Sequence, residues 1–187
     1  MSEFVVGPFN RLHEVGSNVW FDPAQRQPTG GRMPKLAAMA GNHVNLTVRD
    51  LERSVDWYCG VFGLAVVGDE IGVPAASERP LRYRSLADLT TMSYVVGLIE
   101  HSDAVADEFD ERHCGLDHFA MHVPSPEDVV EWADHLTALG VEHSGPKTVA
   151  YETTLFLRDP DGIQLEIACP DVSFWAMRFI AATESDG

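Results

Sequence analysis

His43-Val-Asn-Leu-Thr-Val48 and His118-Phe-Ala-Met-His-Val123 are two stretches of the same kind, and the second begins 75 residues after the first. In both, apolar and polar residues alternate, which is typical of a strand with one buried face. Each stretch is followed by a helix signal, because Asp50 and Ser125 are good N-cap residues ahead of apolar residues at helical spacing. This repeat of strand and helix predicts that the chain contains two copies of one unit.

Three strand-like segments follow each predicted helix, and Asp159-Pro160-Asp161-Gly162 joins the last two of them. Asp, Pro and Gly occupy the positions that a type I turn favours, which predicts a tight hairpin there. The predicted fold is α+β, with two βαβββ modules that form a cupped, mostly antiparallel sheet and helices on its outer face. The six segments are Leu64–Val67, Leu81–Ser85, Met92–Glu100, Val141–His143, Thr148–Leu157 and Ile163–Ala168.

The chain divides into three parts by composition. Residues 1–40 are rich in Gly and Pro without a lasting apolar period, which predicts an irregular N-terminal extension. Residues 41–170 form the two-module domain, with modules at about 41–101 and 116–170. Residues 171–187 form a C-terminal helix and tail, in which Val172–Ala182 is an apolar helix that packs on the body or on a second subunit.

Charge and cysteine content restrict the partners and the compartment. The chain has 29 acidic and 13 basic residues among 187, a net charge of −16, so nucleic acid and anionic membranes are not expected partners. No apolar run reaches the ~20 residues that span a bilayer, and the N-terminus lacks a secretory pattern. Its three cysteines are far apart, which fits a reducing cytoplasm. We therefore expect a cytoplasmic protein that binds a small molecule.

Three polar residues share the polar faces of their strands, namely His43, His118 and Glu166. They converge if the two modules curl together. Two imidazoles and one carboxylate suit Fe2+, Mn2+, Ni2+, Co2+ or Zn2+ and leave positions open on the ion. The alternative role for a histidine at a strand start is a structural hydrogen bond, but the repeat and the shared face favour a metal site.

Further polar residues are candidates for contact with a substrate. They are Asn45, Arg84 and His122, while Glu166 and Tyr151 are candidate catalytic residues. The alternative role of Asn45, Arg84 and Tyr151 is cross-strand polar pairing, and that of His122 is a structural hydrogen bond.

Three segments resemble the vicinal oxygen chelate superfamily: HVNLTVRDLERSVDWYCGVFGL from residue 43, GLDHFAMHVPSPEDVVEWADHLTALGVEHSG from residue 115 and FLRDPDGIQLEIACP from residue 156. That superfamily includes glyoxalase I, fosfomycin-resistance thiol transferases, bleomycin-resistance proteins and extradiol dioxygenases. The resemblance covers about residues 41–170 and implies metal ligands at His43, His118 and Glu166. It also implies a homodimer in which His43 of one chain joins His118 and Glu166 of the other, as in many short members.

One position departs from the glyoxalase I pattern. Members of that type place a fourth ligand, Glu or Gln, on the strand that ends the first module, where this chain has Gly97. Glu100 is expected to face the helices, so His101, which shares the face of Gly97, is the candidate replacement. A site with three ligands resembles those of the dioxygenases or the thiol transferases.

The sequence thus predicts a divalent-metal-dependent enzyme of the glyoxalase/dioxygenase type that acts on a small organic substrate. An extradiol-type oxygenase with Fe2+ is favoured. One alternative is a protein of the bleomycin-resistance type that binds a drug or metabolite without catalysis, although the intact ligand set counts against it. The other is a metal-dependent thiol transferase or a glyoxalase-type lyase or isomerase.

Overall fold

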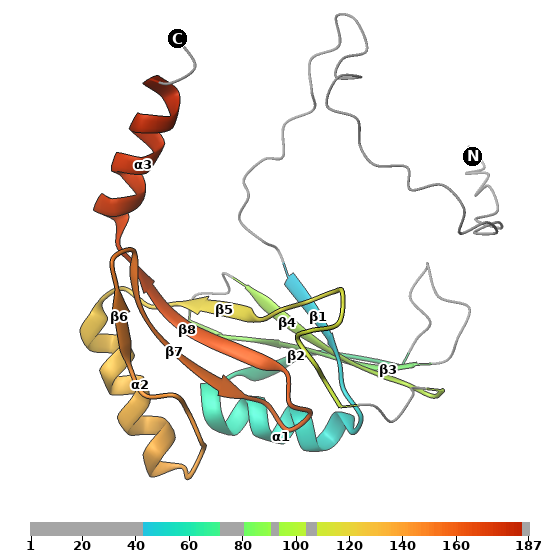
Figure 1. Ribbon diagram of the computed structural model, residues 1–187. Coiled ribbons are helices and arrows are strands. Elements are labelled where there is room, and N and C mark those ends of the chain that lie inside the picture. The colour runs from blue at the N-terminus through green and yellow to red at the C-terminus, as the bar shows by residue number, and fades with distance from the viewer. Residues whose placement is uncertain (1–42, 72–80, 91–93, 104–107, 185–187) are drawn as a thin grey trace, which may run out of the picture. The chain divides into compact units, whose positions relative to one another are not determined.

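The computed structural model describes residues 43–71, 81–90, 94–103 and 108–184, and the predicted extension at residues 1–40 lies outside them. Three helices and eight strands are found in these described ranges (Figure 1). In chain order they are β1 (His43–Thr47), α1 (Leu51–Phe62), β2 (Ala65–Ile71), β3 (Leu81–Ala87), β4 (Val95–His101), β5 (Phe119–His122), α2 (Pro126–Ala138), β6 (Lys147–Val149), β7 (Glu152–Arg158), β8 (Gln164–Pro170) and α3 (Val172–Glu184).

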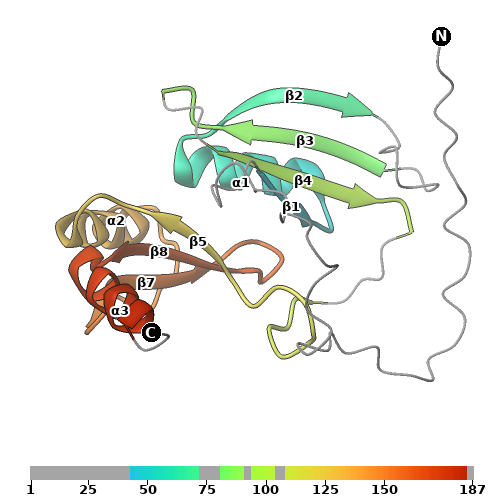
Figure 2. The same ribbon diagram turned by 90° about the horizontal axis from the view of Figure 1, so that it is seen from above.

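The strands form two four-stranded sheets with the same topology, in the orders β1-β4-β3-β2 and β5-β8-β7-β6. In each sheet the first strand of the module pairs in parallel with the last strand, and the other pairs are antiparallel. Helix α1 packs on the first sheet and α2 on the second (Figure 2). The predicted α+β fold with two βαβββ modules is confirmed.

Both module helices begin at the caps that the sequence predicts. The side chain of Asp50 accepts a hydrogen bond from the Arg53 amide at 3.1 Å, and the Ser125 side chain forms a capping box with Asp128. Helix α1 ends at Gly63, whose φ of 66° lies in the left-handed region where glycine is favoured. Each module helix therefore begins at its own local cap.

Alternation along the strands sorts the side chains as predicted. One face of each sheet packs on its helix and is almost inaccessible to water, as at Leu46 on β1, at Val48 directly after β1, and at Leu165 and Ile167 on β8. These residues belong to one hydrophobic cluster that draws on both modules. Burial of a Leu or Ile side chain contributes about 1.5–3 kcal/mol each, so this face determines the register of the strands.

The turn Asp159–Gly162 connects β7 and β8 as a hairpin, and it also contacts the first module. Asp161 accepts hydrogen bonds from the Arg49 amide at 3.0 Å, from Arg49 Nε at 2.7 Å and from Arg53 Nη2. Tyr58 donates a hydrogen bond to Asp159 at 3.1 Å. Burial disfavours the charge on Asp161, but the bonds from Arg49 and Arg53 outweigh this effect, and its pKa lies below the ordinary value. A buried carboxylate thus links the two modules.

Two of the predicted strands are corrected. Val141–His143 is not a strand, and His143 forms an isolated bridge to Leu157. The predicted strand Thr148–Leu157 is two strands, β6 and β7, which form a hairpin in which Thr148 pairs with Thr153. The chain reverses between them without the Gly, Pro, Asn or Asp residues that usually mark a turn, so composition does not reveal it.

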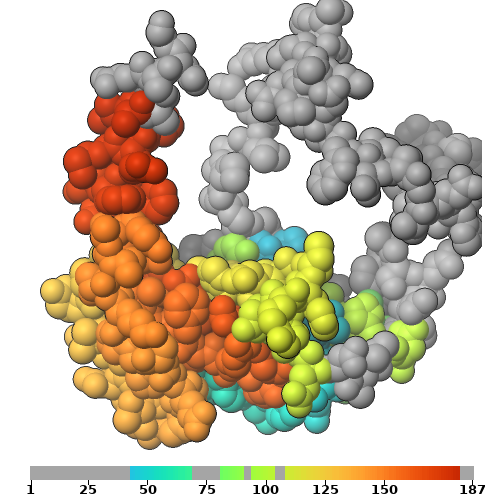
Figure 3. Space-filling view, in the orientation of Figure 1, coloured from blue at the N-terminus to red at the C-terminus, as the bar shows by residue number. Residues whose placement is uncertain are grey.

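The predicted C-terminal helix is confirmed as α3, which extends from the end of β8 away from the sheets (Figure 1, Figure 3). Its first turn contacts the β6–β7 turn through rings of Phe174 and Trp175 against Tyr151. Large apolar side chains on α3 are 52% to 76% exposed, namely Val172, Trp175, Met177, Phe179 and Ile180. Among the helices of the described residues, none combines the length and apolar character needed to cross a membrane.

Candidate metal centre

His118 and Glu166 meet on the face of the second sheet that α2 does not cover. Glu166 lies in the middle of β8 between its partners Ala120 and Phe156, and His118 directly precedes β5. His118 Nε2 and Glu166 Oε2 are 3.0 Å apart, and the Glu166 side chain is only 6% exposed. The ring of Phe156 packs edge-on against the imidazole, with centroids 5.8 Å apart. The structure therefore brings two of the three predicted ligands together.

The separation of these two atoms fits a divalent metal ion. Two ligand atoms that are each about 2.1 Å from an ion, at right angles to each other, are about 3.0 Å apart. His118 Nε2 and Glu166 Oε2 already have this separation. Imidazole and carboxylate are also the donors that Fe2+, Mn2+, Co2+, Ni2+ and Zn2+ accept together. The pair thus fits both the spacing and the chemistry of two neighbouring ligands.

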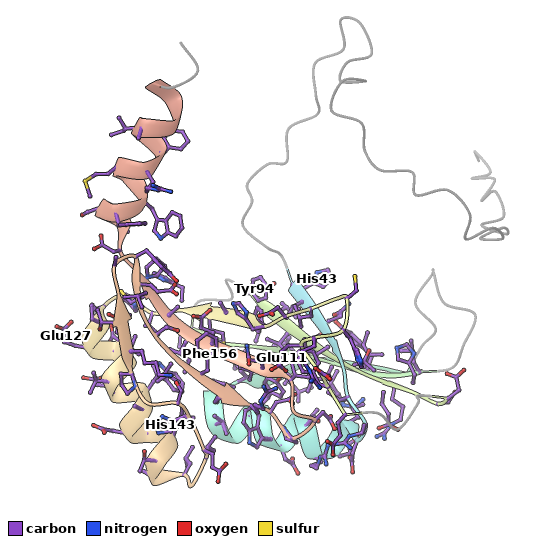
Figure 4. The ribbon with its side chains drawn as sticks, viewed as in Figure 1. His43, Tyr94, Glu111, Glu127, His143 and Phe156 are labelled. Carbon is purple, nitrogen blue, oxygen red and sulfur yellow. The ribbon has the colours of Figure 1, made fainter. Side chains whose placement is uncertain are left out.

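His43, the third predicted ligand, lies in the other sheet. It is the first residue of β1, it is exposed, and it pairs with Val95 of β4 (Figure 4). Within the part of the chain that the structure describes, no group of three or more His, Cys, Asp or Glu side chains is placed to hold a metal ion. One chain therefore supplies His118 and Glu166 as a pair, without His43.

The Asn45 side chain lies where a side chain at position 97 would begin. A Cβ atom added to Gly97 would overlap Asn45 Oδ1 and come within 2.8 Å of Tyr83 Cε2. The Asn45 amide, on the neighbouring strand, therefore occupies the space beside Gly97. A Glu or Gln in place of Gly97 would first have to displace it.

His101 is not placed to replace that ligand at the ion of His43. His43 pairs with Val95, and His101 lies six residues further along β4, which corresponds to about 20 Å along an extended strand. Ligands of one ion lie within a few ångströms of each other. The prediction that His101 is a fourth ligand beside His43 is therefore corrected.

Glu100 and Arg84 both lie on the face that α1 covers. Glu100 Oε2 accepts a hydrogen bond from the Leu51 amide at 2.8 Å, which confirms that this carboxylate faces the helix. Arg84 lies 3.4 Å from Glu52 of α1 and pairs with the fully buried Leu98. The predicted substrate contact of Arg84 is corrected, because its side chain is on the opposite face from Asn45.

Tyr151 and His122 have different placements relative to the pair. Tyr151 lies in the β6–β7 turn, where its ring contacts Phe174 and Trp175 of α3. It therefore contacts α3, and its catalytic role stays a prediction. His122 is exposed on β5 and shares the face of Glu166, so its contact with substrate stays a prediction.

Three polar residues near the pair were not predicted. The Thr154 hydroxyl donates to Glu166 Oε1 at 2.6 Å, and Asp117 Oδ1 lies 2.6 Å from His118 Nδ1. Glu152 lies two residues before Thr154 on the same face of β7, and burial and the charge of Glu166 raise its pKa. In the observed register of β7 and β8, Thr154 and Glu152 share a face with Glu166. The β6–β7 turn was not predicted from the sequence, so these two residues were not placed on that face.

Comparison with known proteins gives the family. The model of the Glyoxalase/Bleomycin resistance protein/Dioxygenase superfamily matches residues 41–167. A lactoylglutathione lyase from Pseudomonas putida is 28% identical over 158 residues, which cover 73% of this chain and 88% of the relative.

Two solved structures extend the likeness to the fold. A glyoxylase/bleomycin resistance protein/dioxygenase domain from Frankia sp. EAN1pec has a TM-score of 0.61 and 25% identity, covering 75% of this chain and all of that one. The fosfomycin resistance protein FosX from Listeria monocytogenes, solved as a variant with Mn(II) and 1S,2S-dihydroxypropylphosphonic acid, has a TM-score of 0.54 and 17% identity. That match covers 76% of this chain and 99% of FosX.

The chain belongs to the glyoxalase/bleomycin resistance protein/dioxygenase superfamily and has the vicinal oxygen chelate fold. The superfamily's name includes both enzymes and resistance proteins, so membership does not by itself distinguish catalysis from binding.

Proposed function

We propose that this protein is a divalent-metal-dependent enzyme that acts on a small organic substrate, and that His118 and Glu166 hold the metal. The observation that carries the proposal is the 3.0 Å contact between His118 Nε2 and Glu166 Oε2 on an open sheet face. A buried carboxylate is costly unless it is paired or coordinates a cation, and Glu166 is 5% exposed. The His118 imidazole that pairs with Glu166 is partly exposed. A metal site requires such access for the ion and the substrate, whereas a purely structural ion pair does not.

We further propose that the third ligand is His43 of the partner subunit in a homodimer. Two features of the chain support this. His43 is exposed at the start of β1, an edge strand, and within the described residues nothing completes the pair to a group of three. The exposed apolar side chains of α3 also provide a surface that a second chain would cover, since apolar patches of this kind are uncommon on monomers.

The reaction that we favour is an extradiol-type oxygenation, with Fe2+ as the metal. A set of two histidines and one carboxylate leaves several positions on Fe2+ open for a diol and O2, which is the chemistry that this ion supplies. The residues of the chain would hold the metal ion and orient its ligands: His118 and Glu166 supply the ligating atoms, and Phe156 packs against the imidazole. Asn45 occupies the space beside Gly97, so a fourth protein ligand there does not fill an open position.

A glyoxalase-type lyase is the second candidate, and the relative from Pseudomonas putida favours it. That protein is a lactoylglutathione lyase, and its match with this chain extends over 88% of its length. Its chemistry would need the same His118–Glu166 pair, with a substrate that carries a thioester and a hydroxyl in place of a diol.

One set of assays distinguishes these functions. Metal-depleted protein is loaded anaerobically with Fe2+, Mn2+, Ni2+ or Zn2+, and each form is tested for O2 uptake with aromatic diols and for turnover of lactoylglutathione. O2 uptake that depends on Fe2+ and disappears in His118→Ala supports the oxygenase. Turnover of lactoylglutathione without O2 uptake supports the lyase. Protein that binds no metal but binds a large aromatic ligand would overturn both and indicate a binding protein.

A further inference from the structure

Asp117 occupies one of the two ring nitrogens of His118. Asp117 Oδ1 is 2.6 Å from His118 Nδ1. The other ring nitrogen, Nε2, faces Glu166 Oε2 at 3.0 Å. A partner on one ring nitrogen of a metal-binding histidine fixes the orientation of the ring. Asp117 thus holds the ring so that Nε2 is the nitrogen beside Glu166.

Thr154 orients the Glu166 carboxylate in the same way that Asp117 orients the imidazole. Its hydroxyl lies 2.6 Å from Glu166 Oε1 and 3.2 Å from the Ile167 carbonyl. A hydroxyl has one hydrogen to donate, and the shorter, charge-assisted bond to the carboxylate is the stronger. Both side chains are buried, so the bond is shielded from water. Oε1 is therefore occupied, while Oε2 faces His118.

We propose that Asp117 and Thr154 are positioning residues that fix the two ligating atoms of the metal site, Nε2 of His118 and Oε2 of Glu166. The proposal rests on the metal site of the proposed function and deepens it. In metal centres, partners of this kind orient the ligands, and their loss typically costs 10–100-fold in metal affinity. Three contacts connect the four side chains in succession, from Asp117 to His118, from His118 to Glu166 and from Glu166 to Thr154.

The exposure of Asp117 and the shape of Thr154 allow a positioning role to be distinguished from a role in folding. The Asp117 side chain is 69% exposed, so its replacement removes little packing. Thr154 is 6% exposed, and valine in its place keeps the shape but removes the hydroxyl. Serine keeps the hydroxyl and loses a methyl group, so Thr154→Ser is the conservative variant that should rescue binding.

The experiment titrates metal-depleted full-length protein with Co2+ and follows both heat and the visible absorption of the bound ion, which reports its coordination. Asp117→Asn and Thr154→Val are expected to weaken Co2+ binding by about 10–100-fold and to alter the absorption bands. Thr154→Ser is expected to stay within about threefold of wild type. Unfolding in urea with a chelator present measures stability without metal.

Two matched variants serve as controls. Thr153→Val removes a hydroxyl from the next residue of β7, which bonds to Thr148 and points to the other face. Asp110→Asn removes a carboxylate that pairs with Arg112 in the loop. Both are expected to bind Co2+ as wild type does.

The outcomes separate this proposal from the metal site itself. If Asp117→Asn and Thr154→Val bind Co2+ with wild-type affinity and spectrum while His118→Ala does not bind, the positioning roles are overturned and the metal site stands. If His118→Ala also binds as wild type does, both are overturned. Weakened binding in both variants, with serine rescue at position 154, supports the proposal.

Discussion

Asp161→Ala tests whether the hairpin turn holds the two modules together. Asp161 is 5% exposed and accepts bonds from the Arg49 amide, the Arg49 and Arg53 guanidinium groups and the Ser54 hydroxyl. These partners lie just after β1 and in α1, more than 100 positions before Asp161 in the sequence. Alanine removes every acceptor at once and leaves donors of the first module without their partner.

The expected loss of stability is about 3 kcal/mol. A part-buried amide left unpaired costs about 1–2 kcal/mol. The side chains of Arg49 and Arg53 are 36% and 45% exposed, so water replaces much of what they lose, and each ion pair contributes at most about 1 kcal/mol. Breaking a fully buried pair would cost 3–5 kcal/mol, which sets the upper limit.

Urea unfolding at pH 7, followed by both fluorescence and circular dichroism, measures this loss. Arg112→Ala, at the exposed partner of Asp110 in a surface ion pair, is the control and should leave the urea midpoint almost unchanged. The pKa of Asp161 is lowered in the folded chain, so its contribution is complete above its ordinary value of about 4 and is lost as the pH falls through the lowered value. The difference between Asp161→Ala and wild type should therefore narrow below about pH 4. A loss under 1 kcal/mol at pH 7 would refute the reasoning.

Three further predictions concern packing, assembly and ligand choice. Gly97→Ala should change the free energy of unfolding by less than about 1 kcal/mol, because the added Cβ meets the outer ends of two side chains, Asn45 Oδ1 and Tyr83 Cε2, which can rotate away; a loss above about 2 kcal/mol would contradict this. Phe179→Glu should shift the protein from dimer to monomer in light scattering, whereas Val130→Glu on α2 should not; dimers that persist in Phe179→Glu would exclude α3 from the interface. His101→Ala should keep wild-type metal affinity while His43→Ala loses it, and the reverse result would restore His101 as the ligand.

Local signals made the modules predictable. Asp50 and Ser125 act as helix caps by themselves, and the alternation from His43 to Val48 separates Leu46 and Val48 from the polar face without knowledge of partners. The same two-residue period correctly turned Glu100 toward α1. These features depend on neighbours in the sequence, so reading them requires no tertiary structure.

The parts that failed depend on pairing between strands. The β6–β7 turn at Tyr151 lacks turn residues, so the register of β7 and the contact from Thr154 to Glu166 were not visible. Arg84 was predicted to contact a substrate, but its pairing with Leu98 across β3 and β4 places it on the face that α1 covers. The distance between His43 and His101 likewise follows from register, which composition does not determine.

The central claim is that His118 and Glu166 of one chain and His43 of the partner subunit hold one metal ion. It is tested most directly by mixing His43→Ala with His118→Ala, allowing subunits to exchange, and measuring bound Co2+. Each variant by itself should bind none tightly. After exchange, half of all dimers contain one chain of each variant, and each of these has one intact site of two. About one quarter of the wild-type metal content should therefore return. Metal retained by His118→Ala, or no recovery in dimers shown to exchange, would contradict the account.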